Sequence, residues 1–283
     1  MNEILYSVVI PTHRRPEQVR DAVDSVMAQS DPRFELLVVC DGDDPETQAA
    51  LLPFLSDRRI HIIKQTHAGV STARNTGIAA ARGTWIAFLD DDDRWHPEKL
   101  ARQAAFMAAT GYLASQCDEI WIRNGTRVNA MKKHAKPSGW IFPQAVERCC
   151  VSPSAVMLHR SLFARIGLFN PDFPVCEDYE LWLRLALAYP VGNLPMALLT
   201  KYGGHADQLS RRFHSMDIWR VRALEGVLNH PILASKPQWQ ALVRLSIITR
   251  SRILAQGAQK HGNPDLARSY SEKHAFYADM MFA

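Results

Sequence analysis

The sequence predicts an α/β fold, in which a mostly parallel sheet is flanked by helices and followed by a helical C-terminal extension. Strand-like and helix-like segments alternate four times within about the first 110 residues, and the strand-like segments are apolar on both faces. Such strands are typical of parallel sheets, because the helices that connect parallel strands cover both faces of the sheet. From about Met216 onward the pattern is helical throughout.

The first half contains four predicted strands, each a short apolar run that is bounded by polar residues. They are expected at Ser7–Pro11, Phe34–Cys40, Ile60–Ile63 and Trp85–Leu89. A helix is expected after each strand, at Pro16–Gln29, Pro45–Leu55, Val70–Arg82 and Pro97–Ala109. The last of these helices opens with proline near its first turn, where proline is well tolerated.

The second half is less regular. Further strands are expected at Tyr112–Arg123, Ala155–His159 and Val191–Leu199, and a polar loop at Asn124–Gly139. A helix is expected at Glu177–Tyr189, where Leu181, Leu185 and Ala188 share one face. We expect three regions: two halves of one domain at 1–110 and 111–210, and the helical extension at 211–283.

The composition is that of a globular protein and argues against several classes. The chain has 283 residues, of which 47% are hydrophobic, and a net charge of +4, too small to indicate nucleic-acid binding. Its five cysteines show no C-x-x-C spacing, so they favour neither a disulfide framework nor a zinc site. The N-terminus has no basic leader, and no apolar run approaches the roughly 20 residues that a bilayer needs. We expect a cytoplasmic protein, at most bound to the inner face of the cell membrane.

Four consecutive carboxylates, Asp90 to Asp93, follow the fourth predicted strand. Ligands of parallel sheets bind beyond the carboxyl ends of the strands, so chemistry is expected here. Helix capping would use one or two of the carboxylates, whereas a bound Mg²⁺ or Mn²⁺ accounts for the cluster better. The chain has neither G-x-G-x-x-G after the first strand nor a P-loop. The cation would therefore carry the charge of a diphosphate group.

Two other features are candidates for chemistry. Glu177 and Asp178 open a predicted helix, where acidic residues are stabilised by the helix dipole and where one could also serve as a general base. Their spacing alone leaves both interpretations open. His205 follows Gly203 and Gly204 in a predicted loop. A loop histidine is more often a surface residue, but this one could also ligate a metal or bind phosphate.

These three signals, in this order, resemble the family 2 glycosyltransferases of the GT-A fold. The resemblance runs from about Tyr6 to Ser210 and rests on SVVIPTHRRPEQVRDAVDSVMAQ, FELLVVCDGD, GVSTARNTGIAAARGTWIAFLDDDDRWHPEKL, CEDYELWLRLA and HADQLS. It implies a Rossmann-like sheet and the inverting transfer of a sugar from a nucleotide diphosphate to an acceptor hydroxyl. The first half would bind the nucleotide-sugar donor, with UDP favoured over dTDP as its nucleotide. The other half would bind the acceptor.

The resemblance also implies a role for each candidate residue. Nucleotide-binding residues are expected at Pro11, Thr12, Arg15, Asp41, Arg74, Asp90 and Asp91. Asp92 would ligate the Mn²⁺ or Mg²⁺ directly, Asp91 would face the ribose or the metal, and His205 would lie near the metal or diphosphate. Asp93 would help to cap the next helix. Asp178 would be the catalytic base, with Glu177 beside it.

Two alternatives belong to other classes. A non-catalytic nucleotide-sugar-binding protein of the same fold would have no need of Asp178. A nucleotidyltransferase would normally show a glycine-rich, basic phosphate loop early in the chain, where this sequence has THRRPEQ. We therefore expect a glycosyltransferase, and bacterial surface polysaccharide or lipopolysaccharide assembly, with a glycan or lipid-linked sugar as acceptor, is the setting that the resemblance implies.

The extension at 211–283 has its own charge balance. Eleven lysines and arginines against five acidic residues leave it a formal charge of +6. Because the basic residues are spread out, a cap on the acceptor half or a homodimer contact is favoured over peripheral binding to an anionic membrane, where a lipid-linked acceptor would wait.

Overall fold

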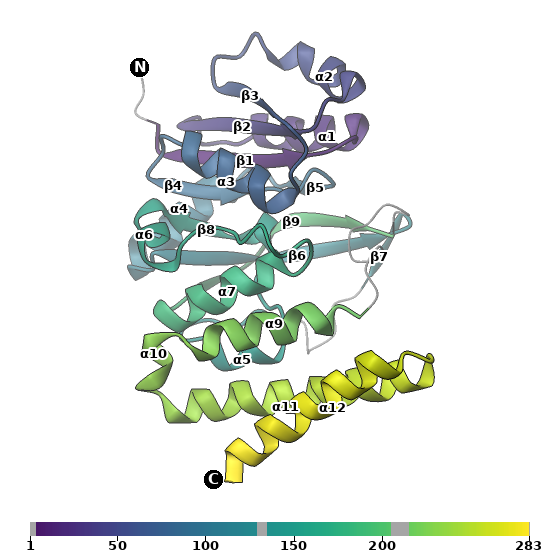
Figure 1. The fold of residues 1–283 in the computed structure, drawn as a ribbon. Coiled ribbons are helices and arrows are strands. Elements are labelled where there is room, and N and C mark those ends of the chain that lie inside the picture. The colour runs from purple at the N-terminus through teal and green to yellow at the C-terminus, as the bar shows by residue number, and fades with distance from the viewer. Residues whose placement is uncertain (1–3, 129–134, 205–214, 283) are drawn as a thin grey trace.

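A computed structural model describes residues 4–128, 135–204 and 215–282. Within these residues nine strands form one sheet, in the order β3-β2-β1-β4-β8-β6-β9-β5, with β7 paired to β6 (Figure 1). The sheet continues from β4 into β8, so the first half and the second half of the chain share it. The boundaries expected for the three regions stay a prediction.

The first four strands are parallel and confirm the predicted α/β half. They are β1 (Tyr6–Thr12), β2 (Phe34–Asp41), β3 (Ile60–Gln65) and β4 (Trp85–Phe88). Each lies at its predicted place, within two residues at either end. The helices between them are α1 (Pro16–Met27), α2 (Pro45–Leu51) and α3 (Val70–Ala80), and α4 (Lys99–Thr110) comes later. The short 3₁₀ helix η1 (Leu52–Phe54) continues α2.

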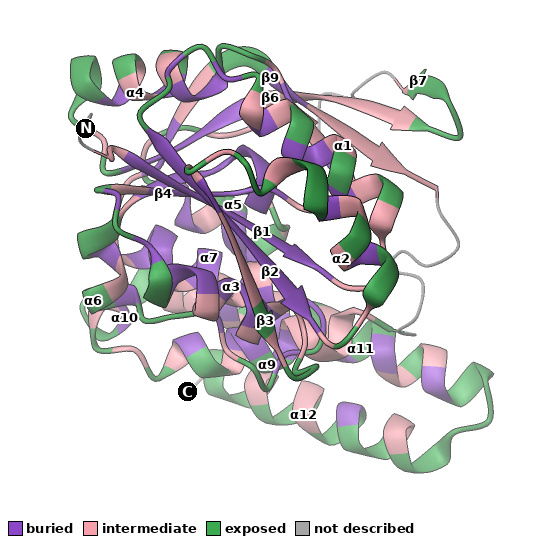
Figure 2. Cartoon of the chain, turned by 90° about the horizontal axis from the view of Figure 1, so that it is seen from above, coloured by how far each residue is buried: buried purple, intermediate pink, exposed green. Residues whose placement is uncertain are grey.

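The sheet separates two hydrophobic cores. In β1, Val8 and Ile10 pack into the core that includes residues of α1 and α4, whereas Val9 packs into the core that includes residues of α3 and of the helices from the second half. Neighbouring side chains of a strand point to opposite faces, so one apolar strand supplies both cores. The central strands are accordingly buried, and exposed residues gather on the outer faces of the helices (Figure 2).

The second half adds antiparallel pairs to the sheet. The strand β8 (Met157–His159) lies antiparallel between β4 and β6 (Ala114–Arg123), and β9 (Gly192–Gly203) runs parallel to β6. Two further strands were not predicted: β5 (Asp93–Trp95) pairs with β9, and β7 (Thr126–Val128) pairs with β6. The turn before β7 is Asn124-Gly125, both at positive φ, which is a local hairpin signal inside the predicted polar loop.

Helices of the second half cover one face of the sheet and build the extension. They are α5 (Phe142–Glu147), α6 (Phe163–Ile166), α7 (Glu177–Ala188), α9 (Asp217–Leu228), α10 (Pro231–Ala234), α11 (Pro237–Lys260) and α12 (Pro264–Phe282), together with the 3₁₀ helices η3 (Pro153–Ala155) and η4 (Arg160–Leu162). The predicted helical extension is confirmed. Its α9 packs on α7, α11 packs on α5 and α9, and α12 packs on α11 at the outside (Figure 1). Among the described helices, none has both the length and the apolar character that crossing a bilayer requires.

Candidate active site

Most of the predicted site residues gather at the carboxyl ends of β1 and β4. These two strands are neighbours in the sheet, but the chain moves from β1 outward to β2 and β3 before it returns to β4. Such a reversal of strand order leaves an opening beyond the strand ends, where ligands of α/β sheets bind. Thr12 is the last residue of β1, and the acidic run begins two residues after β4 ends.

The hydroxyl of Thr12 and the guanidinium of Arg15 hold the middle of the acidic run. Thr12 Oγ1 donates to Asp91 Oδ2 at 2.9 Å, and Arg15 Nη1 donates to Asp91 Oδ1 at 2.8 Å and to Asp92 Oδ2 at 3.2 Å. Burial raises the pKa of Asp91 to about 6, and the charge of Asp92 adds to this, while Arg15 opposes it. Four residues that were predicted to bind nucleotide or metal therefore form one network.

The guanidinium of Arg74 joins the start of the acidic run to α7. Its Nη2 donates to Asp90 Oδ1 at 2.8 Å, and its Nη1 donates to Glu177 Oε1 at 2.7 Å. Arg74 is 3% exposed and lies over the ring of Phe169, 5.1 Å from its centroid. Its described polar contacts are thus with protein carboxylates, and contact with the base or diphosphate stays a prediction.

The two carboxylates on Arg74 differ in their electrostatics. For Asp90, burial would raise the pKa, but the charges of Arg74 and Lys201 outweigh it and hold the pKa below its usual value. For Glu177, burial outweighs the attraction of Arg74, and the neighbouring Asp178 adds repulsion, so the pKa rises to about 7. Glu177 therefore changes its charge near neutral pH, whereas Asp90 stays ionised.

Asp93 does not cap the next helix, and that prediction was wrong. The chain turns into β5 at Asp93, whose buried carboxylate accepts hydrogen bonds from Ser154 Oγ at 2.6 Å and from the backbone N–H of Tyr202 at 3.2 Å. α4 begins only at Lys99, and the residue before it makes no side-chain capping bond. Burial raises the pKa of Asp93 well above its usual value. The acidic run thus contains a structural member that anchors β5 against η3 and β9.

Asp178 is adjacent to Glu177 in α7 but points to different partners. Its carboxylate accepts the backbone N–H of Tyr179 at 2.7 Å and the thiol of Cys149 at 3.5 Å. The residue is half-buried, whereas Glu177 is buried. The helix begins after Cys176, which has the left-handed φ of 59°. Asp178 is therefore partly exposed beside the buried network, and its role as the catalytic base stays a prediction.

Several residues of this site lie outside every motif of the sequence. Ser154 accepts the backbone N–H of Asp90 at 3.1 Å as well as donating to Asp93. Lys201 in β9 donates to Ser152 at 3.0 Å, and its Nζ lies 3.9 Å from Asp93 Oδ2. Burial would lower the pKa of Lys201, but Asp93 and Glu119 raise it, so the amine stays charged. A serine in an irregular segment and a lysine in a strand carry no local signal, so only their contacts identify them.

Asp41 ends β2 and is bound to the loop before α3. Its Oδ1 accepts Gln65 Nε2 and the backbone N–H of Ala68, both at 2.8 Å, and its Oδ2 accepts the backbone N–H of Gly69 at 2.9 Å. The carboxylate thereby shapes the β3–α3 connection, and recognition of a base by Asp41 stays a prediction. Pro11 is buried in β1 beside Val39 of β2. His205 lies outside the described residues.

The chain is similar to known glycosyltransferases. Residues 7–166 match the family model described as glycosyl transferase family 2. A glycosyltransferase of Rickettsia felis is 27% identical over 265 residues, which are 93% of this chain and 44% of that protein. The chain thus spans less than half the length of this relative.

Two shorter relatives carry more specific names. TuaG of Bacillus subtilis, a glycosyltransferase assigned to teichuronic acid biosynthesis, is 30% identical over 190 residues, which are 64% of this chain and 71% of that protein. WfgD of Escherichia coli is named as a UDP-Glc:α-D-GlcNAc-diphosphoundecaprenol β-1,3-glucosyltransferase. It is 31% identical over 186 residues, 65% of this chain and 71% of that protein.

The fold is similar to that of a solved structure. The crystal structure of S. aureus TarS 1–349 in complex with UDP-GlcNAc superimposes with a TM-score of 0.68 at 16% identity, over 96% of this chain and 91% of that one. The predicted GT-A fold, with its sheet flanked by helices and its C-terminal helices, is confirmed by this likeness.

Proposed function

The chain belongs to glycosyl transferase family 2, and on that premise we propose that it transfers a sugar from a UDP-linked donor to a hydroxyl of a lipid-linked glycan. The donor class is supported by WfgD, which is named for UDP-Glc, and by the structure of TarS in complex with UDP-GlcNAc. The acceptor class is supported by WfgD, whose acceptor is a diphosphoundecaprenol-linked sugar, and the setting by TuaG. Assembly of a bacterial surface polysaccharide is a setting that fits this donor class, this acceptor class and the name of TuaG.

One observation carries the proposal. The acidic run beyond β4 and the acidic turn of α7 are joined by Arg74, which bonds Asp90 and Glu177 within 2.8 Å. A donor diphosphate bound at the acidic run would therefore lie close to the helix that presents Asp178. An enzyme that transfers a group in one step needs donor and base at one place. A protein that only binds nucleotide sugars has no use for this arrangement.

Asp91 and Asp92 fit a hard divalent cation. Two adjacent carboxylates supply the oxygen ligands that Mn²⁺ and Mg²⁺ prefer, and the raised pKa of Asp91 reflects burial and the charge of Asp92, both of which a cation would offset. When bound, the cation would neutralise charge on the leaving diphosphate. Arg15 bonds both carboxylates, and its positive charge would also attract the phosphate groups of the donor.

Asp178 carries out the proton transfer in the proposed reaction, and Cys149 orients it. Asp178 Oδ2 takes the proton of the acceptor hydroxyl as its oxygen attacks the anomeric carbon. The bond from that carbon to the diphosphate oxygen breaks on the opposite face, so the anomeric centre inverts. Cys149 donates its S–H to Asp178 and so orients the carboxylate. Cys149 is exposed as a residue, but desolvation at its sulfur and the charge of Asp178 hold the pKa of the thiol well above its usual value, so Cys149 remains a donor.

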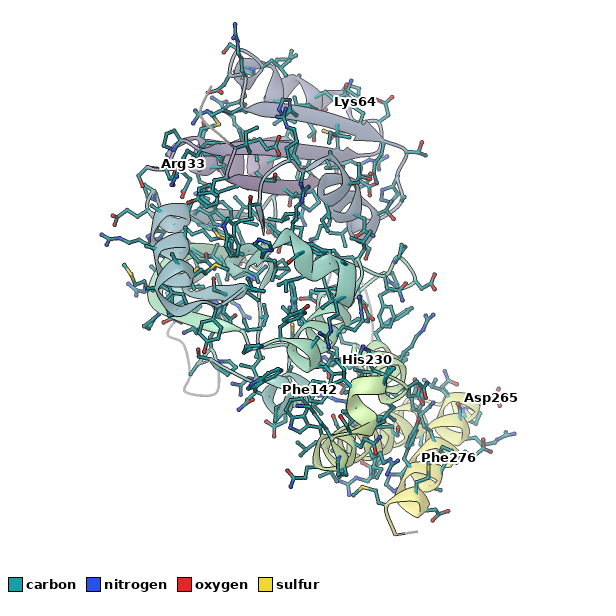
Figure 3. The ribbon with its side chains drawn as sticks, turned by 90° about the vertical axis from the view of Figure 1, so that its left-hand side faces the viewer. Arg33, Lys64, Phe142, His230, Asp265 and Phe276 are labelled. Atoms are coloured by element: carbon teal, nitrogen blue, oxygen red, sulfur yellow. The ribbon has the colours of Figure 1, made fainter. Side chains whose placement is uncertain are left out.

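The extension supports a peripheral position at the cytoplasmic face of the membrane. α9 and α11 pack against the body and serve as a cap, whereas α12 lies outermost with Phe276, Met280 and Met281 exposed. Figure 3 places Phe276 and Asp265 on α12 at the opposite end of the molecule from Arg33 and Lys64. We propose that these exposed side chains of α12 contact the membrane that holds the acceptor. The alternative is that they form a homodimer contact.

The test is an assay of products with the purified chain. UDP-sugars and an undecaprenyl-diphosphate-linked GlcNAc acceptor are incubated with and without Mn²⁺, and products are identified by mass spectrometry. We expect release of UDP together with an acceptor that is heavier by one hexose or N-acetylhexosamine. Binding of UDP without product for any donor would indicate the non-catalytic alternative, and release of pyrophosphate would indicate a nucleotidyltransferase.

A further inference from the structure

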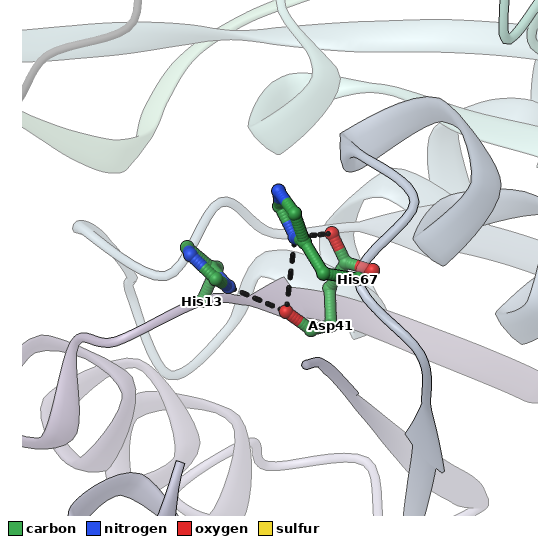
Figure 4. Close-up of side chains that lie close together, drawn as sticks. All are labelled: His13, Asp41 and His67. Carbon is green, nitrogen blue, oxygen red and sulfur yellow. Dashed lines mark hydrogen bonds and ion pairs between the residues drawn. The ribbon is translucent and has the colours of Figure 1, made fainter. Parts of the chain in front are cut away.

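A second group of ligand-type side chains lies at the same edge of the sheet, outside the acidic run. His13 follows β1, Asp41 ends β2, and His67 lies between β3 and α3. One nitrogen of each histidine and one carboxylate oxygen of Asp41 all lie within 4.8 Å of one another. Figure 4 shows the two imidazoles side by side over Asp41, each with a nitrogen directed at it. The three residues come from the carboxyl ends of three neighbouring strands, β1, β2 and β3.

The contacts of the two histidines are alike. His13 Nδ1 donates to the backbone carbonyl of Asp41 at 2.5 Å, and His67 Nδ1 lies 2.9 Å from Asp41 Oδ2. The rings stack at 27°, with centroids 4.2 Å apart. Both rings thus direct Nδ1 at Asp41, His13 at its backbone carbonyl and His67 at its carboxylate.

Hydrogen bonds within the protein already fix the orientation of the Asp41 carboxylate. Its Oδ1 accepts two hydrogen bonds and its Oδ2 accepts one from Gly69, so one lone pair of Oδ2 remains for His67 or for a metal. Gly42 has a φ of +113°, and a Cβ there would lie 3.4 Å from both the ring of His13 and the Cβ of His67. The positive φ, rather than a lack of space, favours glycine at this position.

We propose that His13, Asp41 and His67 bind Zn²⁺. Two imidazoles and one carboxylate are a ligand set of zinc sites that keep a fourth position open, whereas Mn²⁺ and Mg²⁺ prefer sites made of oxygen alone. Ligand atoms that share a tetrahedral zinc are about 3.4 Å apart, since each bond is about 2.0–2.1 Å. The observed 2.9 Å between His67 Nδ1 and Asp41 Oδ2 needs to widen only slightly to admit the ion. Each neutral imidazole binds the ion through Nδ1 as its Nε2–H tautomer, so the ring proton moves from Nδ1 to Nε2 by exchange with water.

This site differs from the acidic run in both chemistry and consequence. Asp91 and Asp92 offer only carboxylates, whereas this group offers imidazoles from loops that the sheet already holds together. A bound Zn²⁺ ties the ends of β1 and β2 to the β3–α3 connection and stabilises the folded chain, because it binds the folded state alone. The proposal does not depend on the sugar donor or on transfer.

The test is titration of the chelator-treated full chain with Zn²⁺, followed by isothermal calorimetry and by the thermal midpoint of unfolding. We expect one strong site and a midpoint that rises by several degrees. His67→Gln and His13→Gln should each weaken Zn²⁺ binding at least about tenfold. His67→Gln is the main variant, because the His67 side chain is 60% exposed and its loss should leave the fold intact.

Two variants serve as controls. His261→Gln changes an exposed histidine between α11 and α12, and Asp92→Asn changes the acidic run. Both should bind Zn²⁺ within about twofold of the unmodified chain. Zinc binding that is unchanged in His67→Gln, or that is lost equally in Asp92→Asn, would overturn the proposal.

Discussion

Arg74 and Glu177 are 103 residues apart in the sequence, yet Arg74 Nη1 lies 2.7 Å from Glu177 Oε1 in the protein interior. The same guanidinium bonds Asp90, so one side chain of α3 connects the acidic run after β4 with the first turn of α7. Asp178 is the next residue of that turn. The position of the proposed catalytic base relative to the proposed donor site therefore depends on Arg74.

Replacing Arg74 should destabilise the fold. Arg74→Met leaves Asp90 and Glu177 without their shared cation, and removing one partner of a buried ion pair typically costs about 3–5 kcal/mol in free energy of unfolding. Urea denaturation measures this loss. The control is Arg268→Met on α12, whose side chain is 70% exposed and whose loss should change stability by less than about 0.5 kcal/mol. Equal stability of the two variants would show that the Arg74 bonds contribute nothing.

The raised pKa of Glu177 predicts a pH dependence of stability. The folded-state pKa of about 7 lies above the ordinary value of 4.5, so the folded chain binds the proton more tightly than the unfolded chain does. Glu177 therefore adds to the free energy of unfolding below about pH 4.5, and this contribution is lost as the pH rises through about 7. Glutamine cannot ionise, so Glu177→Gln should not show this loss. The stability of the variant relative to the unmodified chain should therefore increase between pH 5 and pH 7.5. Glu17→Gln, at an exposed position of α1, is the control variant, and both variants are measured by urea denaturation across this pH range.

Asp178→Asn should abolish transfer and spare donor binding. A positioned general base contributes about 10²- to 10⁴-fold to a rate, so kcat should fall by that factor while the Kd for UDP with Mn²⁺ stays within about twofold. Asp172→Asn is the matched control, because the Asp172 side chain is 75% exposed outside the network and should retain full activity. Transfer by Asp178→Asn at a near-normal rate would remove Asp178 from the mechanism.

Within the acidic run, Asp92 and Asp93 should behave differently. Asp92→Asn removes an oxygen ligand and should weaken Mn²⁺ binding at least about tenfold, as measured by calorimetry in the presence of UDP. Asp93 is buried against Ser154 and Tyr202, so Asp93→Asn should leave Mn²⁺ affinity within about twofold. Chelation of the metal should stop transfer, and added Mn²⁺ should restore it. If Asp93→Asn loses the metal while Asp92→Asn keeps it, the ligand assignment is wrong.

Membrane contact through α12 can be measured by sedimentation with anionic liposomes. Phe276 and Met280 are one helical turn apart and exposed, so the double change Phe276→Glu and Met280→Glu should reduce the bound fraction severalfold. The control is the double change Leu52→Glu and Leu55→Glu, which alters exposed apolar residues directly after α2, the helix at the opposite end of the molecule from α12 (Figure 1). Absence of binding by the unmodified chain, or equal loss in both variants, would contradict a membrane role for α12.

Much of the fold could be predicted because its signals are local. The strands of the first half lie where short apolar runs predicted them, since a buried strand is encoded in neighbouring residues. The acidic run was recognisable as a candidate site because it follows a buried strand. The strand β5 was missed because it has three residues and is stabilised by pairing with β9, more than 100 positions later in the chain.

The sequence by itself determined the order of elements, the family and the residue types that gather beyond the sheet. The tertiary structure alone decided the partners of those residues: Glu177 with Arg74, Asp93 with Ser154, and His13 with His67 over Asp41. The periodicity of apolar residues predicts which face of its own helix or strand a side chain lies on. Contacts between residues at different strand ends depend on which strands become neighbours in the sheet. The crossover connections decide that, and no local sequence pattern encodes it.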